Sequence, residues 1–277
     1  MGMRVTTNIS AINAQRNLVG SQRAIGKSMA QLSSGNRINI SADDAAGLAI
    51  SERLKASIRS GAQAQRNAND GISMVQTAEG GLNEIGNIVV RLRELGIQAA
   101  SDTVGDVERG FLNKEVGQLK AEAQRIAQVT TWGDTKLLDG STPVFDFQVG
   151  IFNNAEEDRI SFNASENVAT LDALGLTDLD YTTKEGAQNG LTNLDAAQNL
   201  TNGYRANLGA LQNRLTATVD NLGVAQENMS AANSRIRDTD VAQASSEMTR
   251  NNILLQAGTA TLAQANQVNQ LALKLIG

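Results

Sequence analysis

The side chains that most often carry out chemistry in enzymes are missing from this sequence. Its 277 residues include no histidine and no cysteine. Imidazole ligands, histidine general bases, thiolate nucleophiles and disulfides are therefore excluded. A Ser-His-Asp hydrolase and a zinc enzyme are ruled out on the same ground. We expect no enzymatic activity and no metal or cofactor.

Two other stretches carry groups that could bind a ligand. Glu156, Glu157 and Asp158 have the composition of a metal or acid–base cluster, but a solvated loop tip explains them better. Gly20–Ser28 has the composition of a phosphate loop, but five residues separate its glycines where the motif needs four. No strand is predicted before it either. We therefore predict neither a metal site nor a nucleotide site.

Charge and hydropathy argue against nucleic acid and membrane as partners. The net charge is −5, and residues 1–42 contain five basic residues and no acidic one. These charges are spaced rather than clustered, which indicates a terminal helix and not a nucleic-acid-binding arm. The uncharged run 251–273 contains eight Asn or Gln and is too polar to span a membrane. The start of the chain has no apolar core of a secretory signal.

The element that organises the chain is a long helix predicted over Ser41–Ala100. Ser41 and Asp44 have the spacing of a capping box. Apolar or small residues then alternate by steps of three and four for more than seven heptads, as in a coiled coil. A helix of this length, roughly 80 Å, needs a long partner. The pattern returns from about residue 191. The seam residues that we predict are Ile50, Leu54, Leu82, Ile85 and Leu92 on the first helix, with Leu208, Leu211, Leu215 and Leu222 on the second.

Shorter elements fill the rest of the chain. A first amphipathic helix is predicted over 5–35, with Gly35 as its stop signal. A further helix follows Gly105, and a turn is expected at residues 132–134. Alternation over 144–149 and 159–162 predicts two paired strands. Residues 164–190 are expected to be irregular. We therefore predict a mainly α fold, with long antiparallel helices in a coiled-coil-like bundle and a small β-hairpin region.

The terminal helices predict self-assembly. A last helix from Val241 to the end of the chain has two apolar stripes, more than one intrachain partner can cover. Repeated contact between two different surfaces of one chain produces rings or open filaments. The residues that we expect to drive this assembly are Ile9, Ile12, Leu18, Ile25, Leu254, Leu262, Val268, Leu271 and Leu275.

Four segments resemble signature sequences of the bacterial flagellin family. The first is Ser41–Ile50, at the start of the long helix; the others are Leu208–Leu215, Asn228–Asp238 and Leu262–Gln267. Together they indicate a short member of the family, with the conserved helical parts only. The resemblance implies a structural subunit that polymerises into the hollow helical filament of the bacterial flagellum, which drives swimming.

The resemblance also implies a domain organisation, partners and a location. Residues 1–44 and 236–277 would form an inner filament domain, and residues 45–235 an outer helical domain with its β-hairpin near 141–165. Partners would be other copies of the chain, cap and hook-junction proteins, and an export chaperone on the C-terminal tail. The subunit would be extracellular, exported unfolded and without a cleaved signal peptide.

Some flagellins are recognised by an animal innate immune receptor through their outer domain. The residues here that fall on the family's receptor-contacting positions are Arg91, Leu95, Gln98 and Glu115. Leu95 also belongs to the predicted helix seam, so packing explains it equally well. Two readings from other classes stay open at this stage. One is a coiled-coil signalling protein of chemoreceptor type, and the other is a secreted adhesin or effector.

Overall fold

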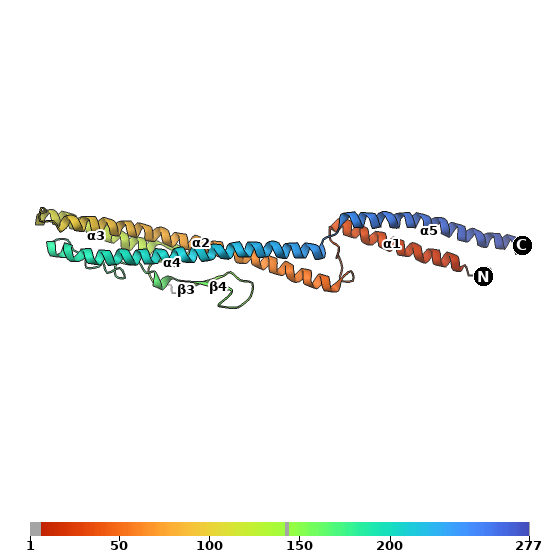
Figure 1. Ribbon diagram of the computed structural model, residues 1–277, viewed down its shortest axis with the longest axis horizontal. Coiled ribbons are helices and arrows are strands. Elements are labelled where there is room, and N and C mark those ends of the chain that lie inside the picture. Colours follow the sequence, from red (N-terminus) through yellow and green to blue (C-terminus); the bar gives the residue numbers. More distant parts are fainter. Residues whose placement is uncertain (1–6, 142–143, 277) are drawn as a thin grey trace. The chain divides into compact units, whose positions relative to one another are not determined.

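The computed structural model describes residues 7–141 and 144–276, with side chains as far as residue 267 (Figure 1). It is mainly α-helical, as predicted. The helices are α1 (Ile9–Ser34), α2 (Ala45–Ala99), α3 (Asp106–Val129), α4 (Lys184–Arg237) and α5 (Val241–Ile276). The strands are β1 (Thr131–Trp132), β2 (Thr135–Lys136), β3 (Val144–Gln148) and β4 (Arg159–Asn163), followed by the 3-10 helix η1 (Ala164–Glu166).

The chain forms two compact units, of which unit 1 is built from two segments far apart in sequence. Unit 1 contains residues 1–57 and 228–277, and unit 2 contains residues 58–227. Unit 1 therefore joins an N-terminal with a C-terminal part of the chain, which is the discontinuous organisation that we expected, whereas unit 2 is one continuous stretch. The boundaries at 57 and 227 lie inside α2 and α4. The filament domains inferred from the resemblance concern the assembled state, and their limits stay a prediction.

In unit 1, α1 and α5 pack against each other as an antiparallel pair. The Asn8 side chain caps α1 by accepting a hydrogen bond from the Ala11 amide, and it donates to the Ala265 carbonyl at 3.0 Å. Further along, Leu18 lies against Gly258. Gly35 ends α1 with φ at 70°, as the stop signal predicted.

The connections between helices in unit 1 are bonded to each other. Asn36 forms an isolated β-bridge with Asp238, and the Arg37 guanidinium donates two hydrogen bonds to the Ile236 carbonyl near the end of α4. Lys27 forms an ion pair with Asp43 at 2.9 Å. This hydrogen-bonded ion pair is the main reason that the pKa of Asp43 lies below its usual value. The connection between α1 and α2 and the connection between α4 and α5 are therefore bonded to each other.

The predicted start of the long helix is wrong by four residues. Residues 41–43 form a turn, and α2 begins at Ala45. The Asp44 carboxylate accepts the Gly47 amide at 2.8 Å, so Asp44 is the capping residue and not Ser41. The predicted capping box is therefore wrong: Asp44 is a single cap, because Gly47 has no side chain that could bond back to the Asp44 amide.

The core of unit 2 is the heptad seam between α2 and α4. Arg93 pairs with Asp195, and Gln65 lies nearest to Gly223, so the helices run antiparallel. The predicted seam residues at its centre are fully buried: Leu82, Ile85, Leu92, Leu208 and Leu215. Leu211 and Leu222 are half-buried, as is Leu54 in unit 1.

Ile50 does not belong to the seam. Its side chain is 51% exposed, while Ser51 is fully buried and donates a hydrogen bond to the Asn233 amide oxygen at 2.8 Å. The sequence pattern favoured the large apolar residue. The structure places the small polar neighbour inside because it has a hydrogen-bond partner on α4.

Residues 164–183 are mostly without regular structure, as predicted, but they are packed into unit 2. Tyr181 is fully buried and donates its hydroxyl to the Leu92 carbonyl, and burial raises its pKa to about 12. Three side chains of α3, namely Asn113, Lys120 and Gln124, bond the backbone of this segment. Helix α4 then begins at Lys184, seven residues before the predicted start.

The strands form two small antiparallel pairs. β1 and β2 join through Gly133, whose φ is 59°, at the turn predicted from residues 132–134. β3 pairs with β4 in the register Phe145 to Phe162, and the two rings stack at 6.0 Å. Phe162 and Ile160 are buried against the helices of unit 2. The predicted β-hairpin is therefore confirmed.

Candidate functional site

The contact between α1 and α5 uses only one side of each helix. On α1 the covered positions recur at steps of three and four: Ala11, Ala14, Leu18, Ser21, Ile25 and Ser28. On α5 they are Ala244, Met248, Asn251, Leu255, Gly258, Leu262 and Ala265. Most of these residues are small, and a methyl group at Gly258 would lie 2.7 Å from a Leu18 methyl. The two helices can therefore approach closely, and the large apolar side chains of their contact, such as Leu18 and Leu262, are only half-buried.

Outside this contact both helices carry large apolar side chains in solvent, and we call this set the uncovered face. It consists of Ile9, Ile12, Val19 and Met29 on α1, with Val241, Ile253 and Leu254 on α5. Ile9 is 59% exposed and Ile253 is 61% exposed. Soluble proteins rarely leave so many large apolar side chains on one pair of helices without a partner.

The predicted assembly residues divide between these two sides. Leu18, Ile25 and Leu262 lie in the contact between α1 and α5, whereas Ile9, Ile12 and Leu254 belong to the uncovered face. The side chains of Val268, Leu271 and Leu275 lie outside the described residues. Half of the six residues whose side chains are described therefore lie in the intrachain contact, and the role of all nine in assembly stays a prediction.

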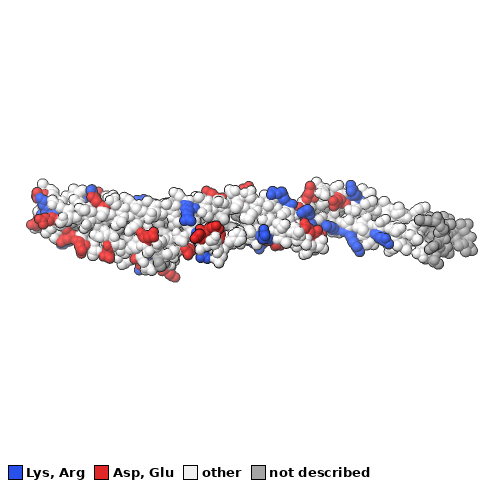
Figure 2. Space-filling view, turned by 60° about the horizontal axis from the view of Figure 1, so that its bottom comes forward, with Lys and Arg blue, Asp and Glu red and all other residues white. Residues whose placement is uncertain are grey.

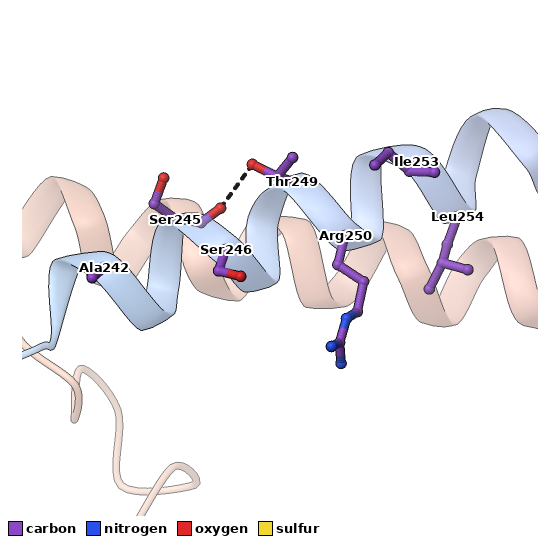
Figure 3. A pocket seen from close by; sticks show the side chains of 7 residues that line it. All are labelled: Ala242, Ser245, Ser246, Thr249, Arg250, Ile253 and Leu254. Atoms are coloured by element: carbon purple, nitrogen blue, oxygen red, sulfur yellow. Dashed lines mark hydrogen bonds between the residues drawn. The ribbon is translucent and has the colours of Figure 1, made fainter.

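A shallow groove runs along the exposed side of α5 (Figure 3). Its lining residues are Ala242, Ser245, Ser246, Thr249, Arg250, Ile253 and Leu254. Ser246, Arg250 and Leu254 extend from one side of the helix, while Thr249 donates its hydroxyl to the Ser245 carbonyl on the other. The groove combines small hydroxyl residues, one cation and apolar side chains, which suits the approach of another helix.

Sequence reasoning missed several residues of this surface. Val19, Ile253 and the groove residues Ser246 and Arg250 were not predicted. Ile253 lies outside the two apolar stripes read from the sequence, so periodicity gave no reason to select it. The charge of Arg250 next to an apolar stripe was the available signal.

The two units carry opposite net charge. Unit 1 has eleven basic and six acidic residues in sequence, whereas unit 2 has 13 basic and 23 acidic residues. Their net charges are therefore +5 and −10. Figure 2 shows acidic side chains spread over the surface of unit 2.

The residues named as receptor-contacting positions lie in unit 2 on α2 and α3. The Arg91 guanidinium bonds both Glu94 and Glu115 at 2.9 Å, and these bonds raise its pKa further. Gln98 is also exposed. Leu95 is different, since it is only 1% exposed and belongs to the core. Packing therefore accounts for Leu95 in this structure.

The described residues offer no site for metal chemistry and no membrane span. Within them, no three His, Cys, Asp or Glu side chains come together as a metal site would require. None of the described helices combines the length and apolar character that crossing a bilayer demands. The triplet at 156–158 lies in the loop between β3 and β4. Asp158 alone of the three is buried, and it accepts the Asn154 amide.

Comparison with known proteins gives consistent matches along the chain. Residues 5–142 match the model of the bacterial flagellin N-terminal helical region, and residues 191–276 match that of the C-terminal helical region. A flagellin of Halalkalibacterium halodurans is 43% identical over 275 residues, which cover 99% of this chain and all of that protein. The flagellar filament core protein flaB2 of Brachyspira hyodysenteriae is 41% identical, with the same coverage.

A solved structure agrees with these matches. The crystal structure of Bacillus cereus flagellin aligns with a TM-score of 0.51 at 30% identity, over 61% of this chain and 94% of that one.

Proposed function

Because the chain belongs to the bacterial flagellin family, we propose that it polymerises into the flagellar filament through the uncovered face of α1 and α5. It is a structural protein and not an enzyme. Family membership also decides against the two alternatives that the sequence left open, namely a coiled-coil signalling protein of chemoreceptor type and a secreted adhesin or effector. The observation that carries the proposal is the row of exposed large apolar side chains on two helices whose mutual contact is made mostly of small residues.

Burial supplies the driving force for this assembly. Apolar area removed from water contributes roughly 25 cal/mol per Å², and the side chains of the uncovered face are about half accessible in the single chain. When one surface of each copy binds a different surface of the next copy, further copies can be added in the same way. If the rotation between neighbours does not bring the last copy back to the first, the product is an open helical filament and not a ring. The inner position of unit 1 around a central channel is part of the same proposal.

Substitution on the uncovered face tests the proposal. Leu254→Asp should raise the lowest concentration at which seeded full-length chains form filaments by at least about tenfold, because the apolar area of Leu254 would be lost and a carboxylate would have to leave water at the interface. Val129→Asp is the matched control, since Val129 is 58% exposed but lies on α3 in unit 2. Sedimentation and electron microscopy measure filaments, and circular dichroism checks helix content. If Leu254→Asp polymerises like the control, the uncovered face is not the interface.

The family also suggests partners at the ends of the filament and during export. We infer cap and hook-junction proteins, a chaperone for the C-terminal tail, and export as an unfolded chain to the cell exterior. The thin contact between α1 and α5 supports the last point, because it opposes unfolding only weakly. Pull-down with the full chain and with a Leu255→Asp variant would test whether the chaperone binds the open helix better than the paired one.

Recognition by an animal innate immune receptor is a second candidate function. The supporting observation is the exposed group of Arg91, Glu115 and Gln98 on neighbouring helices of unit 2, held by the bonds of Arg91. Arg91→Ala should lower the signal of receptor-bearing cells, while Arg125→Ala on α3 serves as a control exposed cation. An unchanged signal from Arg91→Ala would contradict this role.

A further inference from the structure

The pair of helices that forms the uncovered face carries a single carboxylate. In sequence, α1 contains no acidic residue, and α5 contains only Glu247. The cations on α1 are Arg16, Arg23 and Lys27, and those on α5 are Arg250 and Lys274. Two such pairs approaching each other would repel, unless Glu247 meets a cation of the neighbouring copy.

Arg250 is the cation that most needs a partner in such a contact. It lines the groove of α5 beside Ile253 and Leu254 (Figure 3), and none of the described residues forms an ion pair or hydrogen bond with its side chain. Lys27 is already paired with Asp43. Arg16 and Arg23 lie on the exposed side of α1. A helix that covers the groove would remove Arg250 from water, and a buried unpaired cation is strongly unfavourable.

Glu247 is available to supply the charge. It is exposed and accepts a hydrogen bond from its own neighbour Gln243, so one of its carboxylate oxygens is used and the other is not. Its position one turn before Arg250 puts acid and base on adjoining parts of α5. Each copy can therefore give a carboxylate to one neighbour and receive one from another.

We propose that Glu247 of one copy forms an ion pair with Arg250 in the α5 groove of the next copy. This inference rests on the proposed assembly. It adds a polar contact that fixes how α5 of one copy is aligned with α5 of the next copy. The apolar residues around Arg250 bury area, and the hydroxyl of Ser246, which extends from the same side of α5 as Arg250, can complete the hydrogen bonds of the pair. A charge pair at such a contact fixes register more than it adds affinity.

Charge reversal in the full-length chain tests the pairing. Glu247→Arg and Arg250→Glu should each raise the critical concentration for seeded polymerisation by at least about tenfold, because like charges would then meet. The double variant Glu247→Arg with Arg250→Glu should restore polymerisation to within a few-fold of the original chain. The single-variant effects should shrink in high salt, which screens charges.

A second double variant separates Arg250 from the other cations. Glu247→Arg combined with Arg23→Glu should not restore polymerisation, and if it does, the partner is Arg23 and the inference is overturned. Unchanged polymerisation of Arg250→Glu, with the original chain forming filaments, would also overturn it. A merely intrahelical pair between Glu247 and Arg250 predicts this last result. If the original chain itself forms no filaments under seeding, the proposed function has failed instead.

Discussion

Replacing Gly96 by alanine should destabilise unit 2, although alanine is the better helix former. A methyl group at residue 96 would lie 2.9 Å from the Tyr181 hydroxyl, 3.1 Å from its ring and 3.2 Å from a Leu191 methyl. Tyr181 cannot move away, because its ring and Leu179 already fill the space beside Gly190 on α4. The ring of Tyr181 thus lies between glycines of two helices.

The expected size follows from three terms. Overpacking costs about 1–3 kcal/mol, and a buried hydroxyl that loses the Leu92 carbonyl costs about 1–3 kcal/mol. Alanine is about 1 kcal/mol more favourable than glycine in a helix interior, and this offsets part of the loss in stability. We expect a net loss of about 2 kcal/mol in the free energy of unfolding. Tyr181→Phe removes the nearest atom, so Gly96→Ala should cost about 1 kcal/mol less in that background.

Urea unfolding of the unpolymerised full chain, followed by circular dichroism, measures these values. Gly80→Ala is the control on the same helix, because no atom lies within 4 Å of its added methyl group. It should be neutral or stabilising by up to about 1 kcal/mol. If Gly96→Ala proves as stable as Gly80→Ala, the close packing of Tyr181 between the two helices is refuted.

Three further results are expected. Because burial raises the pKa of Tyr181 from 10.0 to about 12, the folded form keeps the phenol proton to higher pH than the unfolded chain does. The resulting contribution to the free energy of unfolding is complete below pH 10 and is lost as the pH rises towards 12. The loss should be about 1.4 kcal/mol per pH unit in that window, and Tyr181→Phe should abolish it in urea titrations at each pH. Asp44→Ala should cost about 1 kcal/mol of unfolding free energy, whereas Ser41→Ala should cost almost nothing; the reverse order would restore Ser41 as the cap. Arg109→Lys should lower the thermal midpoint and cost about 2 kcal/mol, because the buried guanidinium bonds the carbonyls of Ala99 and Ser101 at the end of α2 and lysine cannot reach both.

The long helices were predictable because their signal is repeated many times. A seam with steps of three and four over more than seven heptads tolerates a few wrong positions and still defines a helix and its buried side. Individual positions were less secure. Ile50 was selected for its size, but Ser51 is the buried residue because Asn233, 182 positions later, accepts its hydrogen bond. No local pattern contains that information.

The segment 164–183 shows a second limit of sequence reasoning. It has no periodicity, and irregular chain is expected at the surface because its backbone needs hydrogen-bond partners. Here α3 provides those partners through Lys120, which bonds the carbonyls of Thr177 and Leu179, and through Asn113, which accepts the Tyr181 amide. Nothing in the sequence connects these polar residues of α3 with residues 164–183. Their bonds satisfy backbone groups of the segment that contains the buried Tyr181.

The proposed assembly also explains why so few side chains are buried in unit 1. Among its described side chains on α1 and α5, only Ser28 and Ala244 are buried, and both are small. A pair of helices with so little core gains its stability from whatever covers its other side. Binding between copies then stabilises the folded pair in proportion to the logarithm of the concentration. The proposed export as an unfolded chain and the proposed assembly are both served by this arrangement, since a pair of helices with little core resists unfolding only weakly and gains stability when its uncovered face is buried between copies.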